Sequence, residues 1–159
     1  MDEVDYCIGI DPGPRSHGVV VVKPDYSTIE GMDLSTDELY ATLQRLSVFS
    51  KVEVSCEWIQ SYGMKVGKEV FETVFQIGRI YQSCPMRLIP RLDVKLHICG
   101  QARAKDANIR QALIDRFGMP GTKKNPGRTY GMRAHLWQAF AVAVTAREIS
   151  KTDHEWSPE

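Results

Sequence analysis

The sequence predicts an α/β protein in which helices cover a central sheet. Two short apolar runs, residues 6–10 and 19–22, are separated by a segment rich in Pro and Gly, the pattern of two buried strands joined by a tight connection. Residues 52–57 alternate between apolar and polar side chains, as a strand with one buried face does. Longer segments with apolar residues at helical spacing lie between and after these strands.

Strands and helices are expected to alternate along the chain. Ser35 begins a helix as its N-cap, with acids in the first turn, and Gly118 stops another helix. The expected strands are residues 6–10, 19–22, 27–32, 52–57 and 87–90, and the expected helices are residues 35–46, 66–82, 106–117 and 134–144. Because 159 residues is the size of one domain, we expect a single domain over residues 1–150 and a polar, frayed tail over residues 151–159.

The helix expected at residues 66–82 is too apolar for one buried face. Its apolar residues form two stripes, and the second contains Phe71 and Phe75. An apolar face that remains after the sheet has been covered favours contact with a partner helix, so we expect a homodimer through this segment. A helix buried on both sides within one chain is the alternative.

Two acids stand at the ends of predicted strands. Asp11 follows Ile10 before the Pro-Gly turn, and Glu57 ends the alternating strand. A carboxylate after an apolar run is costly to bury unless it is paired or binds a cation, and Mg²⁺ prefers carboxylate oxygens. If the two strands are neighbours, both acids can serve a two-metal phosphoryl-transfer site. Alternatively, Asp11 caps the turn and Glu57 is an exposed strand-end acid.

The helix expected at residues 134–144 brings two polar side chains to one face. His135 and Gln138 stand three residues apart at its start, in a segment otherwise rich in Ala and apolar residues. Neutral imidazole is a competent metal ligand, so His135 is a candidate third ligand beside the two acids. A hydrogen-bonded structural histidine is the alternative.

Charge is distributed unevenly along the chain. The net charge is zero, which by itself argues against a DNA-binding protein. Residues 91–133, however, hold ten Lys and Arg and three Asp and Glu residues, a net charge of +7. This segment, including the loop with Lys123 and Lys124, is predicted to line a phosphate-binding face. A solvated helix face is the alternative for Arg110 and Arg116.

The composition favours a cytoplasmic protein. No apolar run reaches transmembrane length, and the acidic N-terminal residues do not resemble a signal peptide. The four cysteines are scattered, and two of them fall in predicted core strands, so we interpret them as buried thiols rather than disulfides or zinc ligands. We therefore expect no membrane association.

Several segments, in this order, resemble the RuvC family of Holliday junction resolvases. They are the Ile-Gly-Ile-Asp-Pro-Gly opening at residues 8–13, the strand that ends at Glu57, residues 100–113 and the C-terminal helix, while residues 121–127 and 141–146 resemble the phage and prophage branch. The resemblance implies an RNase H-like fold with a central mixed five-stranded sheet flanked by helices. It also implies a Mg²⁺-dependent crossover junction endodeoxyribonuclease with two ions per active site, for which Mn²⁺ can substitute. Such an enzyme acts as a homodimer on four-way DNA junctions in a bacterial or phage-infected cell.

The resemblance also assigns roles to single residues near the predicted acids. Asp11 and Glu57 correspond to two catalytic, metal-binding acids of the family, and His135 to a position that holds Asp or His. Gln138 falls where many members carry a fourth acid. It is therefore a candidate fourth ligand that brings no charge.

The expected DNA contacts lie outside this acidic group. Lys105 falls near a family lysine that contacts the scissile phosphate, with Asp106 as the alternative at that position. Tyr62 lies in a loop from which some resolvases insert an aromatic ring into the junction; it is expected to stack on a base or to anchor its own loop. The predicted DNA-binding residues are Arg103, Lys105, Arg110, Lys123, Lys124, Arg128 and Tyr62.

Other functions remain open on the sequence alone. A non-catalytic protein that binds branched DNA would explain Gln138, and a nuclease of the same fold could act on forks or flaps instead of four-way junctions. Sugar kinases and actin-like ATPases also begin with a strand, an Asp and a Gly-rich turn, but they need a second domain and a second phosphate loop. A chain of 159 residues leaves no room for these.

Overall fold

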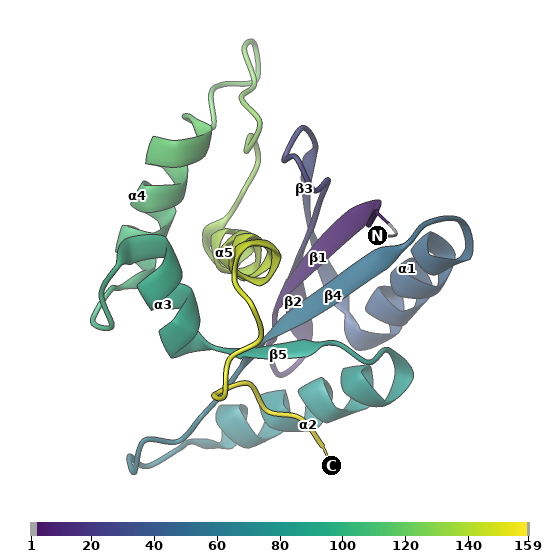
Figure 1. Ribbon diagram of the computed structural model, residues 1–159, viewed down its shortest axis with the longest axis vertical. Helices are drawn as coiled ribbons and strands as arrows, with labels where there is room; N and C mark the ends of the chain where they lie inside the picture. The colour runs from purple at the N-terminus through teal and green to yellow at the C-terminus, as the bar shows by residue number, and fades with distance from the viewer. Residues whose placement is uncertain (1–2, 159) are drawn as a thin grey trace.

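Five strands pair into a mixed sheet at the centre of the molecule (Figure 1). The computed structural model describes residues 3–158. The strands are β1 (Tyr6–Asp11), β2 (Ser16–Val22), β3 (Ile29–Ser35), β4 (Val52–Trp58) and β5 (Arg87–Pro90), in the spatial order β3-β2-β1-β4-β5. The hairpins β1–β2 and β2–β3 are antiparallel, and β4 lies parallel to both β1 and β5. This arrangement confirms the predicted fold class.

Helices cover both faces of this sheet. Figure 1 shows α3, α4 and α5 on one side and α1 and α2 on the other. The helices are α1 (Thr36–Phe49), α2 (Lys68–Ser83), α3 (Arg91–Cys99), α4 (Asp106–Phe117) and α5 (Ala134–Glu148). No helix within residues 3–158 is long and apolar enough to cross a membrane.

Two hydrophobic cores follow from the alternation of side chains along the strands. Cys7, Val20 and Val22 face α3, α4 and α5, whereas Ile8 and Ile10 face α1 and α2. Successive residues of a strand point to opposite faces, so strands covered on both sides are apolar almost throughout. This explains the composition of residues 6–10 and 19–22.

The central helix α5 packs very close to β1. A Cβ atom on Gly9 would lie 2.1 Å from the carbonyl oxygen of Ala139 and 2.8 Å from the Cβ of Ala143. Only glycine on the strand and small residues on the helix permit this approach. The contact fixes α5 across the β1 strand just before Asp11.

The third strand begins later than predicted. Residues 27–32 were expected, but β3 covers Ile29–Ser35. A tight turn precedes it, in which Tyr26 adopts a φ of 59° and donates its N–H to the Lys23 carbonyl at 2.8 Å. The turn occupies residues that the composition assigned to the strand.

The exposed face of α2 excludes one of the two interpretations of that helix. Ile77 and Ile80 are buried against the sheet, while Phe71 and Phe75 are each 66% exposed. The helix is therefore not buried on both sides within one chain. Its second apolar stripe is free to contact another molecule.

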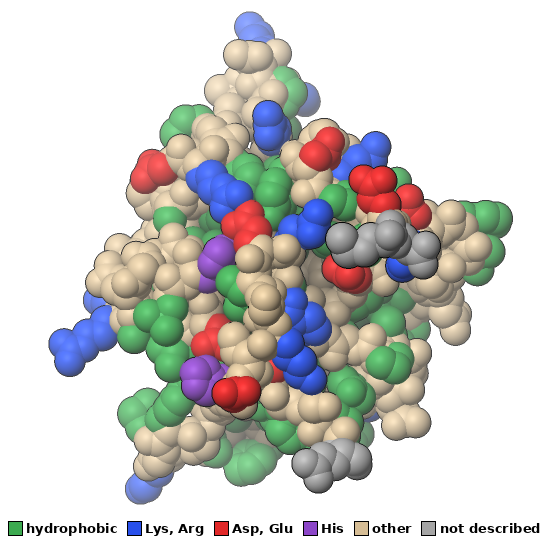
Figure 2. All heavy atoms as spheres, viewed as in Figure 1, with side chains coloured by type: hydrophobic (Ala, Val, Ile, Leu, Met, Phe, Trp, Pro, Cys, Tyr) green, Lys and Arg blue, Asp and Glu red, His purple; other side chains and the backbone are tan. Residues whose placement is uncertain are grey.

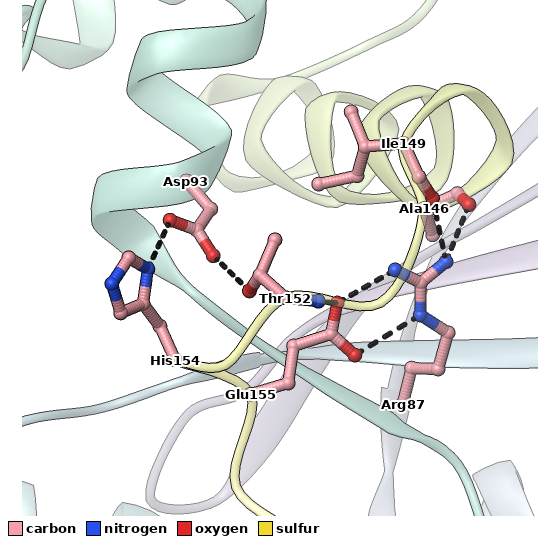
Figure 3. Close-up of polar contacts among 7 residues, drawn as sticks. All are labelled: Arg87, Asp93, Ala146, Ile149, Thr152, His154 and Glu155. Carbon is pink, nitrogen blue, oxygen red and sulfur yellow. Dashed lines mark hydrogen bonds and ion pairs between the residues drawn. The ribbon is translucent and has the colours of Figure 1, made fainter.

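The prediction of a frayed C-terminal tail is wrong for the part of the tail that the structure describes, residues 151–158. Arg87 of β5 forms a partly buried ion pair with Glu155, with 2.6 Å between Nη2 and Oε1 (Figure 3). Trp156 stacks on Trp58 with ring centroids 5.4 Å apart and forms a β-bridge with Leu88. Although the tail is mostly polar, Glu155 and Trp156 pack against the sheet beside β5.

Asp93 of α3 holds the same tail from a second side. Its carboxylate accepts a hydrogen bond from the Thr152 hydroxyl at 2.8 Å and lies 3.3 Å from Nδ1 of His154 (Figure 3). A cavity of about 480 Å³ lies between the tail and the sheet and is lined by Glu53, Ser55 and Arg87 among others. Neither Asp11 nor Glu57 lines this cavity.

Candidate active site

Asp11 and Glu57, here called the acid pair, lie side by side at the ends of neighbouring strands. Ile10 of β1 is in parallel register with Cys56 of β4, so the two acids occupy the next positions along. Both belong to the face that α5 covers. Gly9, two residues before Asp11, contacts that helix, and Cys56, next to Glu57, belongs to the core on the opposite face. The structure thus confirms that the two predicted acids come from adjacent strands.

The ionised forms of the acid pair are unfavourable in the metal-free protein. Burial, followed by the charge of Glu57, raises the pKa of Asp11 to about 7, against the lowering effect of Arg91. Glu57 is only 7% exposed, and burial raises its pKa too, while Arg91 opposes this. A buried and a partly buried carboxylate that repel each other favour a proton or a cation between them.

Arg91 supplies a positive charge to the acid pair. It is the first residue of α3, and its Nη1 donates to both carboxylate oxygens of Glu57, at 3.1 and 3.3 Å. Its Nη2 donates to Asp106 at the start of α4. Burial alone would lower the pKa of Arg91, but Glu57 and Asp106 raise it above its ordinary value. Sequence analysis placed Arg91 only among the basic residues of its segment.

Gln138 presents a buried oxygen with no partner. It is 5% exposed and directly precedes Ala139, the residue that contacts Gly9. Among the described residues, its Oε1 accepts no hydrogen bond. A buried amide oxygen without a partner costs about 1–3 kcal/mol. A cation or a water molecule would remove that cost, and an amide oxygen, like the two carboxylates, is a ligand of the kind that Mg²⁺ accepts.

The described residues contain no group of three or more His, Cys, Asp or Glu side chains positioned to hold a metal ion. The carboxylates that face a shared site are therefore the acid pair, with Asp106 held at its edge by Arg91. Asp106 is close enough for its charge to raise the pKa of Asp11, so it is a candidate for a further ligand alongside Gln138 and His135.

His135 lies one strand away from Asp11. Asp11, Gly18 and Asp33 form one row across β1, β2 and β3 in the sheet register. A Cβ on Gly18 would come 3.0 Å from Cδ2 of His135, so the imidazole covers this glycine. Its Nε2 is hydrogen-bonded to Oδ1 of Asp33. Sequence analysis placed His135 beside the two acids and missed Asp33, which becomes visible only once the register is known.

A second histidine fixes the turn that follows Asp11. His17 is 1% exposed; its Nδ1 accepts the N–H of Gly13 at 3.2 Å, and its Nε2 lies 2.8 Å from the Thr36 hydroxyl. Burial lowers the pKa of His17, which keeps the ring neutral. The Thr36 hydroxyl in turn donates to Gln76 of α2 at 2.7 Å. This chain of hydrogen bonds connects the Asp11 turn to both helices of the opposite face.

The predicted DNA-binding cations are all exposed, and one of them, Arg110, also packs on an aromatic ring. Lys123 and Lys124 lie in the loop between α4 and α5, which forms the tip at the top of Figure 1, and Figure 2 shows Lys and Arg side chains at that tip. Arg110 lies over the ring of Trp137 at 5.7 Å, so part of its role is packing. The exposed cations are Arg103, Lys105, Arg110, Lys123, Lys124 and Arg128.

Arg116, by contrast, forms an ion pair with Glu148. Its guanidinium donates to both carboxylate oxygens of Glu148, at 2.5 and 2.7 Å. This supports the structural interpretation of Arg116 over a role in binding phosphate.

The two aromatic residues near the end of β4 have different surroundings. Trp58 stacks on Trp156 and so has a packing role. Tyr62 is 67% exposed, and its hydroxyl donates to Gln60 at 3.1 Å. Of the two, Tyr62 is the one with a ring open to a binding partner.

Comparison with solved structures identifies the fold. No protein-family model matches the chain, and no curated protein matches it in sequence. The structure of Thermus thermophilus RuvC in complex with a Holliday junction substrate is similar, with a TM-score of 0.65, 18% identity, and coverage of 88% of this chain and 91% of that chain. A structure of Thermus thermophilus RuvC has a TM-score of 0.63 and 19% identity, and the match covers 88% of this chain and 92% of that chain. The chain therefore has the RuvC fold, as the resemblance predicted.

Proposed function

We propose that this protein is a Mg²⁺-dependent endonuclease that resolves four-way DNA junctions by phosphodiester hydrolysis. The observation that carries the proposal is the acid pair at the ends of two adjacent parallel strands, with an unpartnered amide oxygen on the helix that covers them. A similar fold, that of Thermus thermophilus RuvC, has been solved with a Holliday junction substrate.

Asp11, Glu57 and Gln138 are the residues proposed to hold the metal ions. Their oxygens are of the kind that Mg²⁺ and Mn²⁺ accept. When bound, a pair of such ions lowers the pKa of a water nucleophile and stabilises the departing 3′ oxygen. The raised pKa values of both acids indicate that a cation would replace protons at this site.

His135 is proposed to act beside the acid pair, either as a ligand or as the acceptor of a proton from the attacking water. The Asp33 carboxylate holds Nε2, which leaves Nδ1 as the atom for either role. A carboxylate bonded to one ring nitrogen fixes the tautomer and the orientation of the imidazole.

The basic residues of the segment 91–133 are proposed to bind the DNA backbone. Lys105 is exposed and directly precedes Asp106, the acid at the edge of the site that Arg91 contacts. The loop with Lys123 and Lys124 extends this surface away from the sheet (Figure 1). Tyr62 is proposed to stack on an unpaired base at the junction.

A homodimer is proposed through the face of α2 that carries Phe71 and Phe75. Both rings are 66% exposed in the single chain, and large exposed apolar side chains on one helix face mark an interaction surface. Two-fold symmetry suits a substrate that is cut at two equivalent positions.

Cleavage of matched DNA substrates tests the proposal. Four-way junctions, forks, flaps and linear duplexes of the same arm sequences are incubated with the protein in Mg²⁺ or in EDTA. We expect paired incisions in the four-way junction, in Mg²⁺ only. Preferential cleavage of forks or flaps would mean that these are the substrates instead of four-way junctions, with the proposed metal-dependent hydrolysis unchanged.

The second candidate function is a branched-DNA-binding protein without catalysis. It is favoured by the neutral Gln138 and by Arg91, which already places a positive charge at the acid pair. Tight junction binding with no cleavage in Mg²⁺ or Mn²⁺ would support this candidate and remove the nuclease.

A further inference from the structure

Arg91 occupies the place where a cation is expected at the acid pair. Its Nη1 reaches both oxygens of Glu57, and its Nη2 reaches Asp106. The two carboxylates differ, because the Glu57 side chain is 9% exposed and that of Asp106 is 68% exposed. One guanidinium thus bridges a buried acid of the site and an acid at its edge.

The backbone fixes this bridge. Pro90, the last residue of β5, pairs with Trp58, the residue after Glu57, so Arg91 leaves the sheet beside the acid pair. The ring of Pro90 restricts its own φ, and α3 starts at Arg91 itself. The Arg91 side chain is 33% exposed, so it is partly buried where it leaves the sheet.

The bonds of Arg91 use both oxygens of Glu57. A divalent cation bound by Glu57 needs at least one of those oxygens and brings a positive charge next to the guanidinium. Like charges at such a distance in a partly buried site repel each other. Arg91 and a divalent cation therefore compete for Glu57, whereas Asp106 can keep the guanidinium without Glu57.

We propose that Arg91 is a built-in counter-cation, which neutralises the acid pair in the metal-free protein and releases Glu57 to a divalent cation while Asp106 retains it. The inference deepens the proposed function, since it concerns the same site. The alternative is a permanent Arg91–Glu57 bond that orients the carboxylate for the metal. The two differ in the sign of the effect on metal affinity.

Mn²⁺ binding measured by calorimetry, without DNA, tests the proposal. Arg91→Gln should bind Mn²⁺ about tenfold more tightly than the wild type, because a charge-assisted hydrogen bond no longer has to be broken. In EDTA, the same variant should unfold at a lower temperature than the wild type, because the acid pair loses its counter-charge. Saturating Mn²⁺ should raise its unfolding temperature by more than it raises that of the wild type.

Lys95→Gln is the matched control. The charge of Lys95 also lowers the pKa of Glu57, but among the described residues the hydrogen bonds to Glu57 from a basic side chain come from Arg91. Loss of the charge alone should change the Mn²⁺ affinity by less than about threefold, the scale of a screened surface charge. If Lys95→Gln increases the Mn²⁺ affinity as much as Arg91→Gln does, the increase comes from loss of any nearby positive charge. That result would overturn the proposal.

The remaining outcomes also decide the matter. Unchanged or weaker Mn²⁺ binding by Arg91→Gln, or no binding by either protein, would overturn the proposal. If Arg91→Gln does not fold, Arg91→Lys is measured instead; it keeps the charge but not the fork of donors, and its affinity should exceed that of the wild type. Tighter binding by the variants in a protein that cuts no DNA would keep this inference and remove the nuclease.

Discussion

Asp11 is the residue from which we expect the clearest pH dependence of the site. Its pKa of about 7 in the folded protein lies far above the value near 4 of an unfolded Asp. Protonated Asp11 therefore stabilises the metal-free fold at low pH, and this contribution is lost as the pH rises through about 7. A metal ion needs the ionised form, so Mn²⁺ affinity should rise up to about pH 7 and then level off.

Calorimetric titrations with Mn²⁺ between about pH 5.5 and about pH 8.5 check this expectation. Asp11→Asn provides the control, since it removes the titrating group and should bind Mn²⁺ weakly at every pH. An affinity that is constant over the range in the wild type would contradict it.

Asp33 is expected to act through His135. Asp33→Asn should lower the rate of junction cleavage about tenfold, the usual scale for a carboxylate that orients an active histidine. His135→Ala should cost more. In the double variant, Asp33→Asn should add almost nothing to His135→Ala, because its effect passes through a ring that is no longer there.

Cleavage rates of the four proteins in this cycle measure the coupling. Equal effects of Asp33→Asn with and without His135 would show that the two residues act independently. His135→Asp is expected to retain activity, and adding Asp33→Asn should then help rather than harm, since two facing carboxylates repel each other.

Asp11, Glu57, His135 and Gln138 could be predicted as candidates because each is marked by a local pattern. Asp11 ends an apolar run, Glu57 ends an alternating strand, and His135 and Gln138 share a face of one helix. Asp33 and Arg91 could not be assigned in this way, because their roles depend on the register of β3 with β2 and on where the chain leaves β5. His17 was missed because it lies before the strand expected at residues 19–22, whereas β2 begins at Ser16.

At the scale of elements, the apolar pattern of the sequence did not predict short segments whose structure depends on contacts with their neighbours. The helix α3 was not predicted, since its nine residues begin directly after Pro90 with few buried apolar side chains. The four helices with longer apolar repeats were predicted. The tail was misjudged because Glu155 is polar by type but buried by its partner Arg87.

Glu155→Gln should destabilise the fold. Breaking a buried ion pair costs about 3–5 kcal/mol, and because the Arg87 side chain is 29% exposed we expect about 2 kcal/mol. Urea denaturation measures the free energy of unfolding. Asp153→Asn, which removes an exposed acid two residues earlier, is the control and should have little effect. Equal stability of the Glu155 variant and the wild type would mean that the ion pair with Arg87 contributes nothing to the stability of the fold.

At the scale of the whole molecule, the exposed face of α2 predicts assembly. Light scattering should give twice the chain mass of 18.0 kDa for the wild type. The double variant Phe71→Glu, Phe75→Glu should be a monomer, because association would bury two new charges. Phe49→Glu, at the end of α1, is the control, since Phe49 is 88% exposed and lies on another helix. A wild type that remains a monomer with and without DNA would remove the dimer.

The central claim is that the acid pair performs metal-dependent cleavage, and a comparison of Asp11→Asn with the wild type on a four-way junction tests it most directly. Cleavage is followed in Mg²⁺, and junction binding is followed in EDTA on the same samples. We predict that the variant loses cleavage by at least about two orders of magnitude and binds the junction as well as the wild type does, because binding depends on the basic surface. A variant that cuts at nearly the wild-type rate would contradict the account.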